Sequence, residues 1–206
     1  MGIKLLVLAG LPSCGKTTVG KDVAKDLDME FLRESAEYLI DDGYGPGAYA
    51  SEEFDQKILE YELNRDQELL MAKGAGFIVE SWHIGNYSYC LARNSAIAKK
   101  YEEVLNNSGK IFDVVCLFLK ISPELSAYRC REFKWAGRNE VRKAQFHTIE
   151  FLQNLNRCLQ YVREESRIKT FGIDSSKSIT DVTMAARNRA VDFFTHPSVV
   201  TVPREI

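Results

Sequence analysis

Short apolar runs alternate along this chain with longer segments whose apolar residues recur at helical spacing. The runs predict strands over residues 3–9, 29–33, 77–80, 111–121 and 168–173. The segments between them predict helices over 17–27, 34–40, 51–73, 86–105 and 123–132, then a long helix that ends near 163 and a last helix from 178. Strands that alternate with helices through short connections predict an α/β fold, with a five-stranded parallel sheet flanked by helices on both faces. Ligands of such sheets bind at the carboxyl ends of the strands.

Two of the predicted helices carry specific expectations. The helix over 51–73 is expected to bury a stripe of apolar side chains, namely Phe54, Ile58, Leu59, Leu63 and Leu70. The helix over 86–105 is expected to end at the polar cluster 106–109, which closes with a glycine. No repeat, low-complexity tract or linker interrupts the chain. We therefore expect one domain over 1–206, with an irregular tail from 196.

The turn between the first strand and the first helix carries the most specific motif. Its sequence, Gly10-Leu11-Pro12-Ser13-Cys14-Gly15-Lys16-Thr17, matches G-x-x-x-x-G-K-[ST]. The glycines let backbone N–H groups point inward, and the helix N-terminus adds partial positive charge. The lysine brings a full charge to the β- and γ-phosphates, and the threonine hydroxyl can bind Mg²⁺. The sequence thus predicts a P-loop NTPase fold that binds ATP and Mg²⁺ through Gly10, Pro12, Ser13, Cys14, Gly15, Lys16, Thr17 and Thr18.

Carboxylates follow the second and third predicted strands. Phosphoryl transfer needs one carboxylate near Mg²⁺ and a group that positions or deprotonates the acceptor. Glu80 could hold Mg²⁺ together with Thr17, or accept the acceptor's proton. Glu34 is a candidate base or a ligand of the acceptor, and Arg33 beside it is a candidate phosphate partner. The sequence does not assign one role to each carboxylate.

A basic, glycine-containing segment follows the predicted helix over 123–132. Such a segment suits a helical lid, expected over about 131–143, that closes cations over the transferring phosphoryl group. Within and beside it, Arg138 is the expected catalytic cation, Arg129 a nucleotide-binding residue and Arg142 an acceptor-binding residue.

Aromatic residues gather after the third strand. Trp82 and Tyr89 are candidates to stack on an acceptor base, although aromatic side chains near a helix start more often belong to the core. His83 has no partner spacing that indicates a metal site or a triad, so a packing role is favoured for it.

Composition narrows the class of partner. A net charge of −2 and a pI near 6.0 argue against an electrostatically driven nucleic-acid binder. The five cysteines are dispersed without a C-x-x-C pair, which argues against zinc and fits a reducing cytoplasm. Neither a signal peptide nor a membrane span is predicted. We expect a small-molecule acceptor as partner, no nucleic acid, no membrane and a cytoplasmic location, with a homodimer left open.

With these residues placed, the chain to about residue 195 resembles P-loop kinases of the thymidylate kinase and deoxynucleoside kinase superfamily. FLRES at 31–35 is similar to a strand-end element that contacts the acceptor sugar or serves as base in those families, which implies these roles for Arg33 and Glu34. VESWHIGNYSY at 79–89 resembles their acidic element after the third strand, with Glu80 as the acid.

The resemblance extends to the lid and the base-binding side. LFLKISPELSAYRCREF at 117–133 resembles the strand and helix that lead to the lid, and GRNE at 137–140 implicates Arg138. GIDSSKSITDV at 172–182 resembles the thymidylate kinase segment that closes over adenine. It implies that Asp174 and Ser175 border the base.

The chain also departs from these families. Ser81 stands where they carry arginine, so we expect Arg93 to supply the missing contact. Ser35 replaces the proline of their Glu-Pro form. The segment from Glu34 through the helix over 51–73 also resembles the kinases that include ribosylnicotinamide kinase.

Together these features predict an ATP- and Mg²⁺-dependent kinase that acts on a nucleoside or a nucleoside monophosphate. Phosphorylation of ribosylnicotinamide or another small metabolite is the alternative acceptor chemistry. The alternative of another class is a P-loop ATPase or regulatory nucleotide-binding module without an acceptor. A GTPase switch is disfavoured, because no N-K-x-D guanine-binding motif occurs in the chain.

Overall fold

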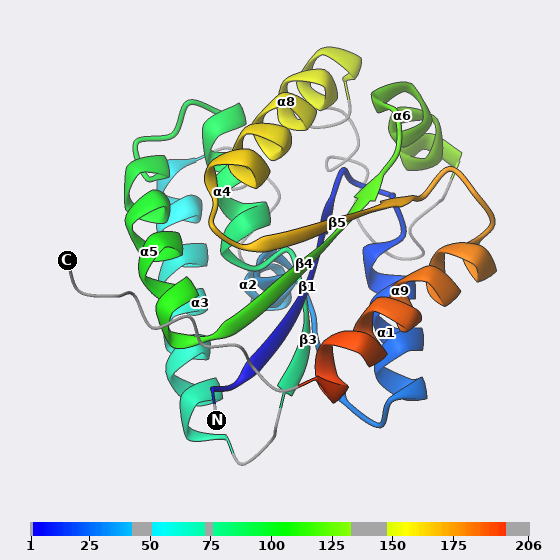
Figure 1. The fold of residues 1–206 in the computed structure, drawn as a ribbon. Helices are drawn as coiled ribbons and strands as arrows, with labels where there is room; N and C mark the ends of the chain where they lie inside the picture. Colours follow the sequence, from blue (N-terminus) through cyan, green and yellow to red (C-terminus); the bar gives the residue numbers. More distant parts are fainter. Residues whose placement is uncertain (1, 43–50, 73–75, 133–147, 197–206) are drawn as a thin grey trace.

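A computed structural model describes residues 2–42, 51–72, 76–132 and 148–196, and they form one sheet with helices on both faces (Figure 1). The strands run parallel in the order β2-β3-β1-β4-β5. Their bounds are Lys4–Gly10 for β1, Glu30–Leu32 for β2, Gly76–Glu80 for β3, Asp113–Lys120 for β4 and Lys169–Asp174 for β5. The predicted α/β fold with a five-stranded parallel sheet is confirmed.

The helices form two layers around the sheet. On one face, α1 (Lys16–Asp26) packs against α9 (Ile179–Thr195). The other face carries α3 (Glu52–Met71), α4 (Trp82–Ala92), α5 (Ala98–Ile111) and α8 (Ile149–Glu165), of which α4 contacts α3, α5 and α8. Two shorter helices, α2 (Ser35–Asp41) and α6 (Pro123–Glu132), pack against α3 and α8 respectively.

Burial explains why the central strands carry so little polar sequence. Every residue of β1 is buried, and so are the six residues 114–119 of β4. A parallel strand covered by helices on both faces cannot alternate apolar and polar residues, so it appears as a continuous apolar run.

Two helix starts are fixed by capping side chains. Ser51 accepts from the Phe54 N–H at 3.1 Å, and Ser178 accepts from the Asp181 N–H at 3.2 Å.

The single helix predicted over 86–105 is wrong. The chain forms α4 and α5 there, separated at residues 93–97. Asn94 has φ 53°, a left-handed conformation that ends α4 and that asparagine tolerates better than most residues. The predicted end at 106–109 is also wrong, because α5 continues to Ile111. A side chain at Gly109 would meet no atom within 4 Å, so this glycine lies on the surface and interrupts nothing.

The predicted apolar stripe of α3 is only half right. Phe54, Ile58 and Leu59 are buried as expected, whereas Leu63 is 38% exposed and Leu70 is 47% exposed. Farther along α3 the inward face is largely charged instead, since it buries Glu62, Arg65, Asp66 and Leu69.

The strand register brings the predicted chemistry to one edge of the sheet. Gly10, the last residue of β1, lies opposite Leu119 of β4, and Glu80, the last residue of β3, lies opposite Leu8. Most of the predicted lid, including Arg138 and Arg142, lies outside the described residues, as does the tail from 197.

Candidate functional site

The phosphate-binding loop curls at the junction of β1 and α1. Gly10 has φ 148° and Gly15, which precedes α1, has φ 97°. The Cys14 N–H donates to the Leu11 carbonyl at 3.3 Å, and the Val19 N–H donates to the Gly15 carbonyl at 2.9 Å. This arrangement of strand, tight loop and helix N-terminus is the one that concentrates backbone N–H groups for an anion.

Gly10 allows β4 to approach the loop, and a side chain there is expected to disrupt it. A Cβ at Gly10 would lie 2.5 Å from the Leu119 carbonyl oxygen, and φ 148° is unfavourable for an L-residue. We expect Gly10→Ala to destabilise the protein by about 1–3 kcal/mol and to weaken ATP binding, as measured by thermal unfolding and calorimetry. Gly109→Ala is the matched control, because the open helical position should gain up to about 1 kcal/mol. Equal ATP affinity in Gly10→Ala and the wild type would contradict a close-fitting loop.

Lys16 points back into the loop. Its buried Nζ donates to the carbonyl oxygens of Gly10 and Leu11, both at 3.3 Å. Burial acts to lower the pKa of Lys16, but the acidic groups Cys14, Glu80 and Glu34 around it outweigh burial and raise that pKa above its usual range. The amine therefore stays charged at the place where the loop would receive phosphate.

Thr17 and Glu80 meet where α1 begins and β3 ends. The Thr17 hydroxyl lies 3.0 Å from Oε1 and 2.9 Å from Oε2 of Glu80, to which it donates. Burial raises the pKa of Glu80 to about 7, and the charge of Glu34 adds to this, while Lys16 and Thr17 oppose it. A hydroxyl and a buried carboxylate are hard oxygen donors of the kind that Mg²⁺ prefers, so this pair fits the predicted metal site.

The charge of Glu34 acts on the Thr17–Glu80 pair. Glu34 directly precedes α2 and raises the pKa of Glu80 and of Lys16. The charge of Glu34 also acts on Tyr89 of α4, whose pKa is raised by burial first and by Glu34 second. The structure thus places Lys16, Glu80, Glu34 and Tyr89 in one electrostatic neighbourhood.

Arg33 is engaged in contacts with α2. Its guanidinium lies 3.3 Å from Asp41, 3.7 Å from Glu37 and over the ring of Tyr38, with 4.4 Å from the guanidinium carbon to the ring centroid.

One sequence expectation on the acceptor side needs correction. Trp82 is completely buried and its Nε1 donates to Asp66 at 2.9 Å, so its ring belongs to the core and offers no face to a base. Arg93 forms an ion pair with the buried Asp55 and lies over the ring of Tyr89, with its guanidinium carbon 5.6 Å from the centroid. A contact of Arg93 with the acceptor stays a prediction.

The turn after β5 packs directly on the phosphate loop. The Ser175 hydroxyl donates to the Cys14 carbonyl, and Arg129 donates from Nη1 to the Ser175 carbonyl at 2.9 Å. Asp174 instead accepts from the Ser176 N–H at 3.0 Å and hydroxyl at 2.6 Å, which lowers its pKa. Thus Ser175 binds the loop, Arg129 binds Ser175, and Asp174 shapes the turn, while their contacts with a nucleotide stay predictions.

Helix α6 holds the outer part of the loop through residues that no sequence motif marks. The Ser126 hydroxyl donates to the Pro12 carbonyl at 2.8 Å, and the Ser13 hydroxyl lies 3.2 Å from the Cys130 sulfur. Burial raises the pKa of Cys14, and its buried side chain fills space in the loop. Thr18, by contrast, is exposed at the start of α1.

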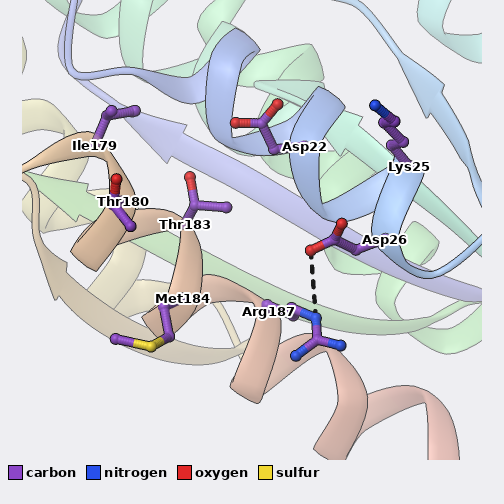
Figure 2. A pocket seen from close by; sticks show the side chains of 8 residues that line it. All are labelled: Asp22, Lys25, Asp26, Ile179, Thr180, Thr183, Met184 and Arg187. Atoms are coloured by element: carbon purple, nitrogen blue, oxygen red, sulfur yellow. Dashed lines mark ion pairs between the residues drawn. The ribbon is translucent and has the colours of Figure 1, made fainter.

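A pocket of about 390 Å³ lies between α1 and α9 (Figure 2). Asp26 and Arg187 pair across it at 3.3 Å between Oδ2 and Nε. Its other lining residues are Asp22, Lys25, Ile179, Thr180, Thr183 and Met184. Only Ile179 links it to the loop, because a Cβ at Gly15 would lie 3.5 Å from the Ile179 Cδ1. The carboxylates Glu34 and Glu80 do not line this pocket.

Comparisons with known proteins point to one kind of fold. No model of a protein family matches the sequence, and no curated protein matches it. The deoxyadenosine kinase from M. mycoides with the products dCMP and dCDP is similar in structure, with TM-score 0.64 and 17% identity over 91% of this chain and 98% of that one. The same kinase with bound dATP gives TM-score 0.63 and 18% identity, with the same coverage. The YorR protein from Bacillus subtilis, in complex with phosphorylated GDP, gives TM-score 0.59 and 15% identity over 94% of this chain and 99% of that one.

Within the described ranges, none of the helices combines the length and the apolar character needed to cross a bilayer. The parallel sheet, the loop at the end of β1 and the similarity over nearly the whole chain agree with one another. This protein therefore has the fold of the P-loop kinases, the structural class to which its neighbours belong.

Proposed function

We propose that this protein is a Mg²⁺-dependent kinase that transfers the γ-phosphoryl group of ATP to a nucleoside or a nucleoside monophosphate. The observation that carries the proposal is the convergence of Lys16, the Thr17–Glu80 pair and Glu34 at the carboxyl edge of the sheet. The similar structures support it, because one is a deoxyadenosine kinase with dCMP, dCDP or dATP bound.

Each carboxylate has a separate role in this proposal. Glu80 already receives the Thr17 hydroxyl, so these two residues would hold Mg²⁺. Glu34 would then orient the acceptor hydroxyl and take its proton. Lys16 would exchange its two carbonyl partners for phosphate oxygens and stabilise the charge that develops on them. The metal supplies further positive charge beside the phosphates.

We further propose that a nucleoside is a better acceptor than its monophosphate. The support for this choice is the similarity in structure to a deoxyadenosine kinase.

A coupled assay of ADP release tests the proposal. The purified protein is given MgATP and, one at a time, nucleosides, nucleoside monophosphates and ribosylnicotinamide. We expect ADP release to depend on the acceptor, with nucleosides giving the highest kcat/KM. ADP release at the same rate without any acceptor would instead indicate an ATPase module, and a nicotinamide-specific response would favour the alternative kinase.

Replacing Glu80 should change the metal requirement more than the fold. Glu80→Gln keeps the shape and can still accept from Thr17, but it removes the buried negative charge. We expect the Mg²⁺ concentration for half-maximal turnover to rise about 10–100-fold, the range for altered metal-site partners. A magnesium titration of ADP release measures it. An unchanged magnesium requirement would exclude Glu80 as a metal ligand.

A further inference from the structure

The inward face of α3 carries three buried charged residues in one short stretch. Glu62 is 0% exposed, Arg65 is 6% exposed and Asp66 is 7% exposed. Burying charged side chains is unfavourable unless each is paired and hydrogen-bonded. Here each is paired, and the partners lie almost entirely in the two turns that carry Glu34 and Glu80.

The turn that carries Glu34 is bound to α3 through the residues on either side of Glu34. Arg65 donates from Nη1 to the carbonyl oxygen of Arg33 at 3.1 Å. The Ser35 hydroxyl donates to Glu62, which also pairs with Arg65. The residues directly before and after Glu34 are therefore both attached to α3.

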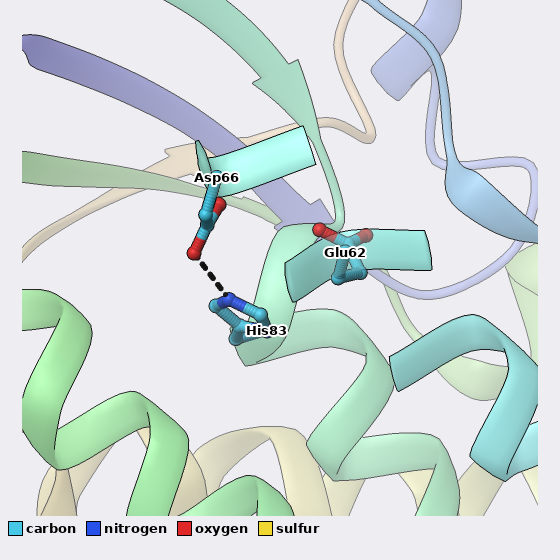
Figure 3. A group of neighbouring side chains, drawn as sticks. All are labelled: Glu62, Asp66 and His83. Atoms are coloured by element: carbon cyan, nitrogen blue, oxygen red, sulfur yellow. Dashed lines mark hydrogen bonds and ion pairs between the residues drawn. The ribbon is translucent and has the colours of Figure 1, made fainter. Parts of the chain in front are cut away.

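The second turn is bound directly after Glu80. Trp82 donates from Nε1 to Oδ1 of Asp66 at 2.9 Å, and the Nε2 of His83 lies 2.8 Å from the other oxygen of Asp66. Asn86, one helical turn on, donates to Glu62 at 2.9 Å. Figure 3 shows Asp66 of α3 directed toward His83 of α4, with Glu62 of α3 beside them.

The backbone between Glu80 and α4 needs such support. Ser81 has φ 64° and ψ −57°, values of a rare and strained γ-turn, and Trp82 has φ 45°. Strained residues persist at functional sites only where their surroundings hold them. Asp66 provides that support, because it binds the side chains of the two residues that follow Ser81.

The cluster also contains residue types that bind metals, but its contacts argue against a metal site. Ligand atoms of Glu62, Asp66 and His83 lie within 4.8 Å of one another. However, all four carboxylate oxygens already have partners, and one of these partners is the guanidinium of Arg65. A divalent cation would have to displace hydrogen-bond partners from both carboxylates. The arrangement is that of an internal hydrogen-bond network.

We infer that Glu62, Arg65 and Asp66 are positioning residues that fix the separation of Glu34 and Glu80. The expected effect on catalysis rests on the proposed function. The positioning of the two turns rests on the contacts described above. Buried ion pairs can often be replaced by apolar residues without loss of stability, so stability alone does not explain them. The contacts of Glu62, Arg65 and Asp66 explain why these charged residues are buried. Through them, one helix connects two turns that are far apart in the sequence.

A double variant separates positioning from simple stabilisation. Glu62→Met with Arg65→Met replaces the pair by flexible apolar side chains of similar length and leaves no unpaired buried charge. Because Ser35 and Asn86 lose their acceptor, we expect the melting temperature to fall by a few degrees, as in the control below. We expect kcat to fall about 10–100-fold, since small displacements of reacting groups have effects of that size. The KM for ATP should change less than threefold, because the phosphate loop is untouched.

Two single variants complete the test. Asp66→Asn keeps the shape of the side chain and an acceptor for Trp82. It tests the inference even if the double variant does not fold. We expect it to lower kcat about 10-fold. Ile58→Val is the matched control on the same helix, because Ile58 is 5% exposed and takes no part in the network. It should lower the melting temperature by a few degrees without changing kcat.

Hydrogen exchange provides a readout that does not need activity. Amides of residues 33–36 and 80–83 should exchange faster in Asp66→Asn and in the double variant, but not in Ile58→Val. If the wild type transfers a phosphoryl group to none of the acceptors, the proposed function is wrong. Hydrogen exchange would still test whether the three residues position the two turns. Unchanged exchange in those segments, or a folded double variant with wild-type kcat, would overturn the inference.

Discussion

The substitution Lys16→Ala is expected to lower kcat by about 10²–10³-fold, the effect of removing one preorganised charge at a transition state. Lys16 is the buried cation of the phosphate loop, and its Nζ reaches only the Gly10 and Leu11 carbonyl oxygens among the hydrogen bonds described. Its removal therefore takes away charge that is fixed in place before the nucleotide arrives. The ADP-release assay measures the loss, and the far-ultraviolet circular dichroism spectrum should not change.

Lys21→Ala is the control for Lys16→Ala. Lys21 lies on the same helix but is exposed, so its removal should leave kcat within twofold of the wild type. Calorimetry with MgATP and with the nucleoside adds a second comparison. Loss of Lys16 should weaken the binding of MgATP and hardly change the affinity for the nucleoside. Near-normal turnover in Lys16→Ala would contradict the assignment of this loop as the phosphate site.

The part of the site that sequence could predict is the part that is local in the chain. The loop from Gly10 to Thr17 needs only a strand before it and a helix after it, and both are visible as apolar patterns. The positions of Glu80 and Glu34 follow from the same logic, because strand ends in a parallel sheet share one edge. What sequence left open was the division of roles between them, since it depends on the contact between Thr17 and Glu80 across 63 positions of the chain.

The charged face of α3 could not be predicted from periodicity. A pattern of apolar residues assigns Leu63 to the interior and Glu62 to solvent, whereas the structure has the reverse. Glu62 is buried because Ser35 and Asn86, both distant in the sequence, supply donors for it. Pairing between distant polar groups leaves no local signal, so the network was missed entirely.

Trp82 and the break after α4 illustrate a different difficulty. The helix begins four residues earlier than its polar start at Asn86 suggests, because the strained turn at Ser81 places Trp82 directly into the core. A strained turn of this kind has no composition signature. Asn94 did carry a usable signal, since asparagine followed by serine favours a helix end, but the apolar residues around it continued the helical pattern.

Glu34→Gln should lower kcat about 10²–10⁴-fold if Glu34 takes the proton of the acceptor hydroxyl, which is the range for loss of a general base. The amide keeps the size of the side chain but cannot accept a proton at neutral pH. The KM for ATP and the magnesium requirement should stay within about threefold, because Lys16, Thr17 and Glu80 are unchanged. Glu30→Gln, at the exposed start of β2, is the matched control and should leave turnover unaffected.

The pattern of losses in Glu34→Gln and Glu80→Gln decides between the two carboxylates. If Glu34 is the base, its variant loses kcat at every magnesium concentration, whereas the Glu80 variant recovers turnover as magnesium rises. The converse pattern, with Glu34→Gln rescued by magnesium and Glu80→Gln not rescued, would exchange their roles. That exchange would overturn the proposed roles, which rest on the Thr17 hydroxyl lying within 3.0 Å of both Glu80 oxygens.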